Sequence, residues 1–399
     1  MLDGAPYMTK RRIFFRNNGL SPIDIIKWWR YQKKLDLKWP QFDNRTVIFT
    51  YLGRIGNAML CKLWHIQSGD EILVPSYNCG SEIDPFLCFG MKAMMYRVDS
   101  KLNIDIDDLR KRISKRTKII YVTHYFGWPQ HLADIAIFCE EHHLFLIEDC
   151  ALSLFSNSSE GPIGRLGDAA IFSFRKTLPV PDGAALVLQS NSMIQSLPET
   201  HPAFRTTAKE VAPYIVRWLI HSMQNRALLS NAIFFLDQLF AHNDAQHLQS
   251  DNLDMPKDYY FSEHVLPLTI SCLSSAILRT IDPEEVFIQR RKNYHQLYEG
   301  LADIDTAKPL SGALPEGVCP LLMPLVVPDV FKWQRELRRL GIKAIRWWEG
   351  FNKKLDWGEF PEAKKLKNEL LVLPVHHYLT SDDINYMIHC LHMTATAQS

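Results

Sequence analysis

Short apolar runs alternate with amphipathic stretches between residues 47 and 150, and this alternation limits the fold more than any other feature of the chain. The apolar runs predict strands at 47–51, 71–75, 92–98, 118–123 and 144–148. The stretches between them predict helices at 53–65, 82–89, 105–113 and 132–142. Strands and helices that alternate at this spacing form a mostly parallel sheet with helices on both faces. The sequence therefore predicts an α/β fold, in which ligands bind at the carboxyl ends of the strands.

The remaining segments divide the 399 residues into an arm, a large domain and a small domain. Residues 1–45 are predicted to form an N-terminal arm with one helix at 22–34. Residues 46–275 form the predicted large domain, in which the polar, helical stretch 191–265 is interpreted as an insertion or lid. Residues 276–399 form the predicted small C-terminal α/β domain. It begins with one long helix from about 275 to 301, followed by strands at 321–327, 343–346 and 370–373 and helices at 330–340 and 381–389.

Composition and charge favour a soluble enzyme that has neither nucleic acid nor a membrane as partner. Hydrophobic residues make up 47% of the chain and charged residues 22%, which suits a large buried core. The net charge of +1 gives no attraction to nucleic acid or anionic lipid. No apolar run reaches about 18 residues, the length of a membrane-spanning helix, and no secretory signal pattern opens the chain. The eight cysteines include no CxxC pair, so they are interpreted as reduced core thiols in a cytoplasmic protein that binds no metal.

A carboxylate and an amine follow two apolar runs. Asp149 ends one of them, and Lys176 comes 27 positions later, after the run at 169–174. Strand ends meet at one edge of a sheet, so the acid and the amine can face each other across a cleft. Pyridoxal phosphate chemistry needs this pair: an amine that forms a Schiff base, and a carboxylate that keeps the pyridine nitrogen protonated. Without that cofactor, Lys176 is interpreted as a surface lysine in a turn and Asp149 as a structural or helix-capping carboxylate.

Five motifs stand in an order that resembles the DegT/StrS family of pyridoxal-phosphate sugar aminotransferases. They are GDEILVPS at 69–76, HYFGWP at 124–129, IEDCA at 147–151, GDAAIFSF at 167–174, and LLVLPVH at 370–376, which is followed by Leu379 and Thr380. The resemblance covers roughly residues 45–190 and 280–390. It implies the fold-type I architecture of pyridoxal-phosphate transferases, in which a large domain with a mostly parallel sheet precedes a small C-terminal α/β domain.

The resemblance also implies an activity. An aminotransferase of this family moves an amino group to a keto-sugar nucleotide, with glutamate as the expected donor, in surface polysaccharide or amino-sugar biosynthesis. Active sites of the family form at a subunit boundary, so a homodimer is expected. The stretch 191–265 is expected to set the sugar specificity.

Residue roles follow from matching the family motifs one by one. Lys176 is expected to form the Schiff base, and Asp149 is expected to pair with the pyridine nitrogen. Gly53 and Arg54 open a helix after a strand, where backbone N–H groups and a guanidinium suit a phosphate. Ser173 is expected to bind the same phosphate through its hydroxyl. The interval from Ser173 to Lys176 is three residues here and five in most relatives.

Two positions depart from the family pattern. Leu152 stands where most relatives carry Gln or His beside the phenolic oxygen of the cofactor, and Cys79 stands where an aromatic ring usually stacks on it. Tyr77 or His124 is the candidate substitute for that ring. The Asn-x-Arg element that many relatives place before the long helix is not evident near 267–271, which leaves the contact with a partner subunit undefined.

These departures keep alternatives to transamination open. A protein that retains the fold without the reaction would bind the cofactor or a nucleotide sugar as a regulator or scaffold, and Leu152 and Cys79 favour this hypothesis. Sugar dehydration on the same cofactor is a second alternative, but dehydrating relatives carry histidine in place of the lysine. An unrelated nucleotide-binding α/β enzyme is a third, and the chain contains neither a GxGxxG nor a P-loop motif to support it.

Overall fold

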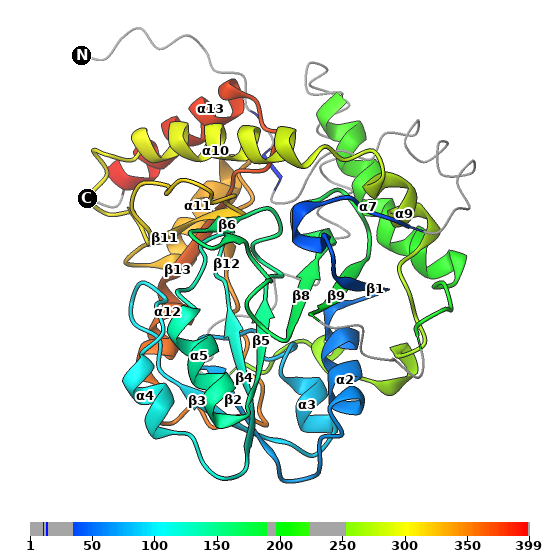
Figure 1. Ribbon diagram of the computed structural model, residues 1–399. Helices are drawn as coiled ribbons and strands as arrows, with labels where there is room; N and C mark the ends of the chain where they lie inside the picture. Colours follow the sequence, from blue (N-terminus) through cyan, green and yellow to red (C-terminus); the bar gives the residue numbers. More distant parts are fainter. Residues whose placement is uncertain (1–10, 12, 15–34, 190–196, 223–252, 398–399) are drawn as a thin grey trace, which may run out of the picture.

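The computed structural model describes residues 11, 13–14, 35–189, 197–222 and 253–397 (Figure 1). The helix predicted at 22–34 and a large part of the predicted insertion at 191–265 lie outside these residues. The described part of that insertion holds the helix α7 (Phe204–Ser222) and two 3-10 turns, η3 (Lys257–Tyr259) and η4 (Glu263–Val265). Among the described helices, none is long and apolar enough to cross a membrane.

A seven-stranded sheet forms the centre of the larger unit, in the order β1-β9-β8-β5-β4-β2-β3. Its strands are β1 (Thr46–Thr50), β2 (Glu71–Pro75), β3 (Lys92–Tyr96), β4 (Thr117–Thr123), β5 (Phe145–Asp149), β8 (Ala169–Ser173) and β9 (Ala184–Leu188). β9 is antiparallel to its neighbours β1 and β8, and the pairs from β8 across to β3 are parallel. The mostly parallel sheet predicted from the alternating pattern is therefore confirmed.

Helices cover both faces of this sheet (Figure 1). α2 (Gly53–Leu63) and α3 (Asp84–Cys88) contribute to the core on one face, and α4 (Ile106–Lys111) and α5 (Ala133–His142) contribute to the core on the other. Neighbouring residues of each strand face opposite cores because side chains alternate along a strand. The strands are apolar on both faces for this reason, as expected of a covered parallel sheet.

A second sheet, with four antiparallel strands in the order β10-β11-β13-β12, forms a smaller unit. Its strands are β10 (Lys308–Pro309), β11 (Leu322–Val326), β12 (Ile345–Arg346) and β13 (Leu370–Pro374). The helices of this unit are α10 (Pro283–Glu299), α11 (Val330–Arg339), α12 (Pro361–Glu369) and α13 (Ser381–Thr396). Figure 1 shows α10 and α13 side by side, over a core that contains the fully buried Trp333.

The single long helix predicted from about residue 275 is wrong. The structure has two helices here, α9 (Cys272–Leu278) and α10. Asp282 caps the second helix by accepting a hydrogen bond from the N–H of Glu284, and Pro283 is its first residue. Proline lacks the N–H that a continuing helix needs, yet its backbone suits a helix start, so the chain breaks between the two helices. The sequence pattern also misses α12.

The described residues near the start of the chain lie against the smaller unit. Ile13 pairs with Ile342 in an isolated parallel bridge. Arg11 forms ion pairs with Asp382 and Asp383, at 3.1 and 2.8 Å, beside the start of α13. These contacts connect the first residues that the structure describes with the last helix of the chain. The 3-10 turn η1 (Pro40–Phe42) follows later and packs on β8 of the larger sheet.

Candidate functional site

Asp149 and Lys176 lie at the carboxyl ends of neighbouring parallel strands. Asp149 is the last residue of β5, and β5 pairs with β8 in a register that sets Asp149 opposite Ile171. β8 ends at Ser173, and the one-turn helix α6 (Phe174–Thr177), which carries Lys176, follows without a gap. The structure thus brings the carboxylate and the amine singled out from the sequence to one edge of the sheet.

Asp149 is buried and held by a hydrogen bond. Its Oδ1 accepts from the N–H of Ala151 at 2.9 Å. Burial raises the pKa of Tyr121 well above its ordinary value, and the charges of Asp149 and Glu82 raise it further. Tyr121 therefore remains a neutral phenol.

Glu82 is a further ionisable group at this edge of the sheet, and no sequence motif marks it. Its Oε1 accepts from the N–H of Cys79 at 2.9 Å. Burial raises the pKa of Glu82, repulsion from Asp149 raises it further, and attraction to Lys176 acts in the opposite direction. Glu82 is therefore counted among the ionisable groups at this edge of the sheet. One signal was available: Glu82 follows β2, whose carboxyl end lies at the same edge of the sheet.

Two guanidinium groups lie near the start of α2. Gly53 is the first residue of this helix, and a Cβ there would come within 3.1 Å of Ile171, so glycine allows α2 to approach β8 closely. Arg54 donates to the backbone carbonyl oxygens of residues 258–260. Burial lowers the pKa of Arg54, and repulsion from Arg175 lowers it further. The motifs point to Arg54 as a phosphate ligand, whereas the structure adds Arg175 beside it.

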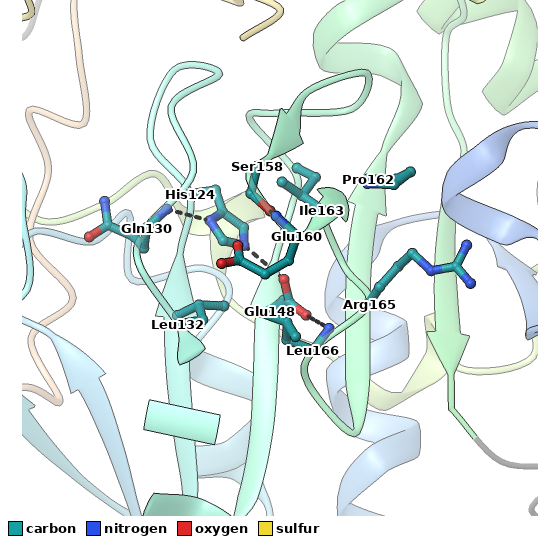
Figure 2. A pocket seen from close by; sticks show the side chains of 10 residues that line it. All are labelled: His124, Gln130, Leu132, Glu148, Ser158, Glu160, Pro162, Ile163, Arg165 and Leu166. Atoms are coloured by element: carbon teal, nitrogen blue, oxygen red, sulfur yellow. Dashed lines mark hydrogen bonds and ion pairs between the residues drawn. The ribbon is translucent and has the colours of Figure 1, made fainter. Parts of the chain in front are cut away.

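His124 belongs to a separate cluster around Glu148 (Figure 2). Its Nε2 lies 3.0 Å from Oε2 of Glu148, and its Nδ1 accepts from the N–H of Gln130 at 2.9 Å. Because Nδ1 is an acceptor, the ring proton is assigned to Nε2, which donates to Glu148. Both ring nitrogens of His124 are therefore engaged by the protein itself. Contact of His124 with a cofactor stays a prediction.

Glu148 is buried and accepts hydrogen bonds from the loop before β8. The N–H of Gly164 donates to Oε2 at 2.9 Å, while those of Leu166 and Gly167 donate to Oε1 at 2.8 and 2.6 Å. Burial by itself raises the pKa of Glu148. The hydrogen bond from His124, together with those from the backbone N–H groups, outweighs that effect and holds the pKa below its ordinary value. Glu148 is thus a structural anion that joins β4, β5 and this loop.

A pocket opens beside this cluster and the hairpin of β6 (Asn157–Ser158) and β7 (Gly161–Pro162) (Figure 2). The Sγ of Cys150 and the ligand atoms of His124 and Glu148 lie within 4.8 Å of one another, as in a metal site. The hydrogen bonds described above already use the imidazole and carboxylate atoms that would bind an ion. We therefore interpret this cluster as structural.

Tyr77 and Leu152 are packed into the core. The hydroxyl of Tyr77 donates to the carbonyl oxygen of Trp347 at 3.4 Å, and its ring centroid lies 5.8 Å from that of Tyr125 and 5.2 Å from that of Trp348. Leu152 is fully buried in the same hydrophobic cluster. The use of the Tyr77 ring as a stacking partner for a cofactor stays a prediction.

Comparison with known families matches residues 44–202 to the DegT/DnrJ/EryC1/StrS aminotransferase family. Among curated proteins, the chain is similar to the GDP-perosamine synthase of Vibrio cholerae, with 28% identity over 132 residues that cover 32% of this chain and 36% of that protein. The aligned segments span 36%, 37% and 53% of the lengths of the first three curated relatives.

Solved structures match nearly the whole chain. PseC of Helicobacter pylori, an aminotransferase involved in the biosynthesis of pseudoaminic acid, aligns over 97% of this chain and 100% of its own, with a TM-score of 0.68 and 15% identity. The GDP-4-keto-6-deoxy-D-mannose-3-dehydratase of Escherichia coli with bound hydrated PLP aligns over 96% and 100%, also with a TM-score of 0.68 and 15% identity. At such identities the likeness establishes the fold, and the predicted fold of pyridoxal-phosphate-dependent aminotransferases is confirmed.

Proposed function

We propose that this chain, in which residues 44–202 form a domain of the DegT/DnrJ/EryC1/StrS aminotransferase family, is a pyridoxal-phosphate-dependent aminotransferase that acts on a keto-sugar nucleotide. One observation carries the proposal: the amine of Lys176 and the buried carboxylate of Asp149 follow neighbouring parallel strands at one edge of the sheet. Glutamate is the proposed amino donor. The proposed setting is surface polysaccharide or amino-sugar biosynthesis in the cytoplasm, with the chain as a homodimer.

The residues at this edge of the sheet fit pyridoxal phosphate. When bound, the cofactor supplies an aldehyde that condenses with amines and a pyridine ring that withdraws electrons. Arg54, Arg175, the hydroxyl of Ser173 and the N–H groups at the start of α2 would hold its phosphate. The fit rests on the two guanidinium groups, because an anion between them offsets the repulsion that acts on Arg54.

Two side chains of the protein would take part in the reaction, each in a different role. Asp149, whose Oδ1 accepts from the N–H of Ala151, would hold a proton on the pyridine nitrogen. Lys176 would hold the cofactor at rest and, once displaced by an incoming amine, would move a proton between substrate and cofactor carbons.

The names of similar proteins support a sugar substrate. They favour transamination over the two alternatives, binding without catalysis and sugar dehydration. They include a GDP-perosamine synthase and an aminotransferase involved in the biosynthesis of pseudoaminic acid. A binding role without catalysis is not favoured, since these relatives are named for enzymes. The dehydratase alternative requires a histidine at the position of Lys176.

Reduction with borohydride tests the proposal. Protein loaded with pyridoxal phosphate is reduced, digested and mapped by mass spectrometry, and the phosphopyridoxyl group is expected on Lys176. Lys367, a buried lysine, serves as the internal comparison. Modification at Lys367, or of no lysine, would contradict the assignment of Lys176.

The Arg175→Met variant is expected to bind pyridoxal phosphate more weakly by about tenfold to a hundredfold, because one charge-assisted contact contributes about 1.5–3 kcal/mol. Affinity is measured by titration of the cofactor absorbance. Pyridoxal without phosphate is the matched ligand, and its weaker binding should be unchanged by the substitution. The exposed Arg335→Met variant is the matched control. Equal losses for both ligands would show that Arg175 does not contact the phosphate.

A further inference from the structure

A buried guanidinium binds the end of the short helix that carries Lys176. Arg290 lies in α10, and only 1% of its surface is exposed. Its Nη2 donates to the carbonyl oxygen of Thr177 at 2.6 Å. Thr177 is the last residue of α6 and directly follows Lys176. The side chain of Arg290 therefore contacts the backbone one residue beyond the candidate amine.

The other terminal nitrogen of Arg290 binds the segment before β11. Nη1 donates to the carbonyl oxygens of Pro320 and Leu321 at 3.1 and 3.0 Å. Leu322, the next residue, begins β11 in the sheet of the smaller unit. Because the two nitrogens belong to one planar group, they fix the carbonyl group of Thr177 relative to the segment before β11.

A helix of one turn depends on a partner of this kind. Within α6 the N–H of Leu178 donates to the carbonyl oxygen of Phe174 at 2.8 Å, whereas the last carbonyl groups of any helix have no partner inside it. A single turn is also too short to be stable by itself. Arg290 supplies a charged donor to the final carbonyl group of α6, and charged donors form the stronger hydrogen bonds.

Backbone carbonyl groups offset the charge of Arg290. Burial lowers its pKa to about 10, so the guanidinium is still protonated at neutral pH. A buried cation that loses its partners is strongly unfavourable, so the three carbonyl contacts are expected to persist in the folded protein.

We propose that Arg290 is a positioning residue that holds α6, and with it the amine of Lys176, in one orientation at the edge of the sheet. The inference rests on the proposed function and deepens it. The amine has to meet the cofactor aldehyde at bonding distance and in a defined direction, and an error of about 1 Å in such a placement can slow a reaction about a hundredfold. Arg290 acts on Lys176 through the backbone of Thr177.

The neighbouring Arg291 offers a matched control. Its Nη1 donates to the carbonyl oxygens of Pro315 and Val318 at 2.7 and 2.8 Å. These acceptors lie in the same stretch of chain before β11, and neither belongs to α6. Arg291→Met therefore removes contacts of the same kind from the same helix and leaves the carbonyl group of Thr177 bound.

The first test uses protein without cofactor, so it does not depend on the proposed function. In Arg290→Met, hydrogen–deuterium exchange of the amides at 174–180 is expected to be about tenfold faster, because the bond from a charged donor to α6 is lost. Peptide mass spectrometry measures it. Exchange in β4 of this variant, and exchange at 174–180 in Arg291→Met, should match the unaltered protein. Unchanged exchange at 174–180 in Arg290→Met, or an equal increase in β4, would overturn the proposal.

Arg290→Lys keeps the test decisive if Arg290→Met does not fold. Lysine retains the positive charge, but its nitrogen stops one bond short of the position of Nη2. A smaller increase in exchange at 174–180 is expected, again without a change in β4. Exchange equal to that of the unaltered protein would overturn the proposal in this variant too.

The second test follows the reaction of Lys176 itself. Each protein is mixed with pyridoxal phosphate, and stopped-flow spectroscopy measures the rate at which the visible absorption band appears. The band is expected to form about ten- to a hundredfold more slowly in Arg290→Met, and at the unaltered rate in Arg291→Met. Faster exchange at 174–180 with an unslowed band would overturn the action of Arg290 on Lys176. Absence of the band from the unaltered protein would instead contradict the proposed function.

Discussion

The Lys176→Ala variant is expected to lack the visible absorption band of the cofactor-loaded protein and to transfer amino groups at least about a thousandfold more slowly. The substitution removes both the amine that holds the cofactor and the group that moves the proton, and proton transfer by a positioned side chain alone contributes about 10²–10⁴-fold. The measurements are the absorption spectrum and the single-turnover reaction with glutamate. The exposed Lys115→Ala variant should behave like the unaltered protein.

Two further observations separate this effect from a loss of folding. Circular dichroism and the midpoint of thermal unfolding of Lys176→Ala should remain close to those of the unaltered protein. The Lys176 side chain is only partly buried, so its removal should cost little stability. Added methylamine should restore part of the proton transfer, because a free amine can enter the space that the side chain leaves. A Lys176→Ala protein that keeps the band and the rate would place the reactive amine elsewhere.

The Glu148→Gln variant is expected to lower the free energy of unfolding by about 1–3 kcal/mol, the usual cost of leaving a buried donor unsatisfied. The amide keeps one acceptor oxygen but presents an NH₂ group to N–H donors, either at Gly164 and His124 or at Leu166 and Gly167. A buried donor facing another donor remains unsatisfied. Urea unfolding at pH 7 measures the loss, with Glu140→Gln as the exposed control.

The pH dependence of this effect has a definite sign. The pKa of Glu148 in the folded protein lies below its ordinary value of 4.5, so the folded state binds a proton less readily than the unfolded chain does. Its stabilising contribution is therefore complete above that ordinary value and disappears as the pH falls through the folded pKa. The difference between Glu148→Gln and the unaltered protein should shrink in that acidic window. A difference that stays constant there would show that the charge of Glu148 is not its cause.

The sequence predicts the sheet well because its strands carry their own local signals. The run predicted at 71–75 is found as β2 with the same ends, since an apolar stretch buried on both faces stops at a proline. Asp149 and Lys176 could be selected for a related reason. Both follow apolar strands, and the carboxyl ends of parallel strands share one edge of the sheet. Strand order does not follow from such local signals, and neither does the antiparallel direction of β9.

Local sequence patterns do not predict the role of a side chain whose partners come from distant segments of the chain. Lys367 lies in a lysine-rich stretch that indicates an exposed helix surface, yet its ammonium group is buried against carbonyl oxygens from three places. The pKa of Glu82 depends on Asp149 from β5 and Lys176 from α6, and no motif in the sequence links Glu82 to these two residues. Arg54 was matched to a phosphate by its motif, but its guanidinium also binds carbonyl oxygens of residues 258–260, which no local pattern predicts.

The ion pairs of Arg11 with Asp382 and Asp383, and the bridge between Ile13 and Ile342, have a consequence for synthesis on the ribosome. Arg11 and Ile13 emerge well before their partners, because about 370 positions separate Arg11 from Asp383 along the chain. The larger sheet can assemble during translation before the smaller unit is complete, because that unit needs α13. A recombinant fragment that starts at residue 44, the beginning of the family match, would lack Arg11 and Ile13 and therefore their contacts with the smaller unit.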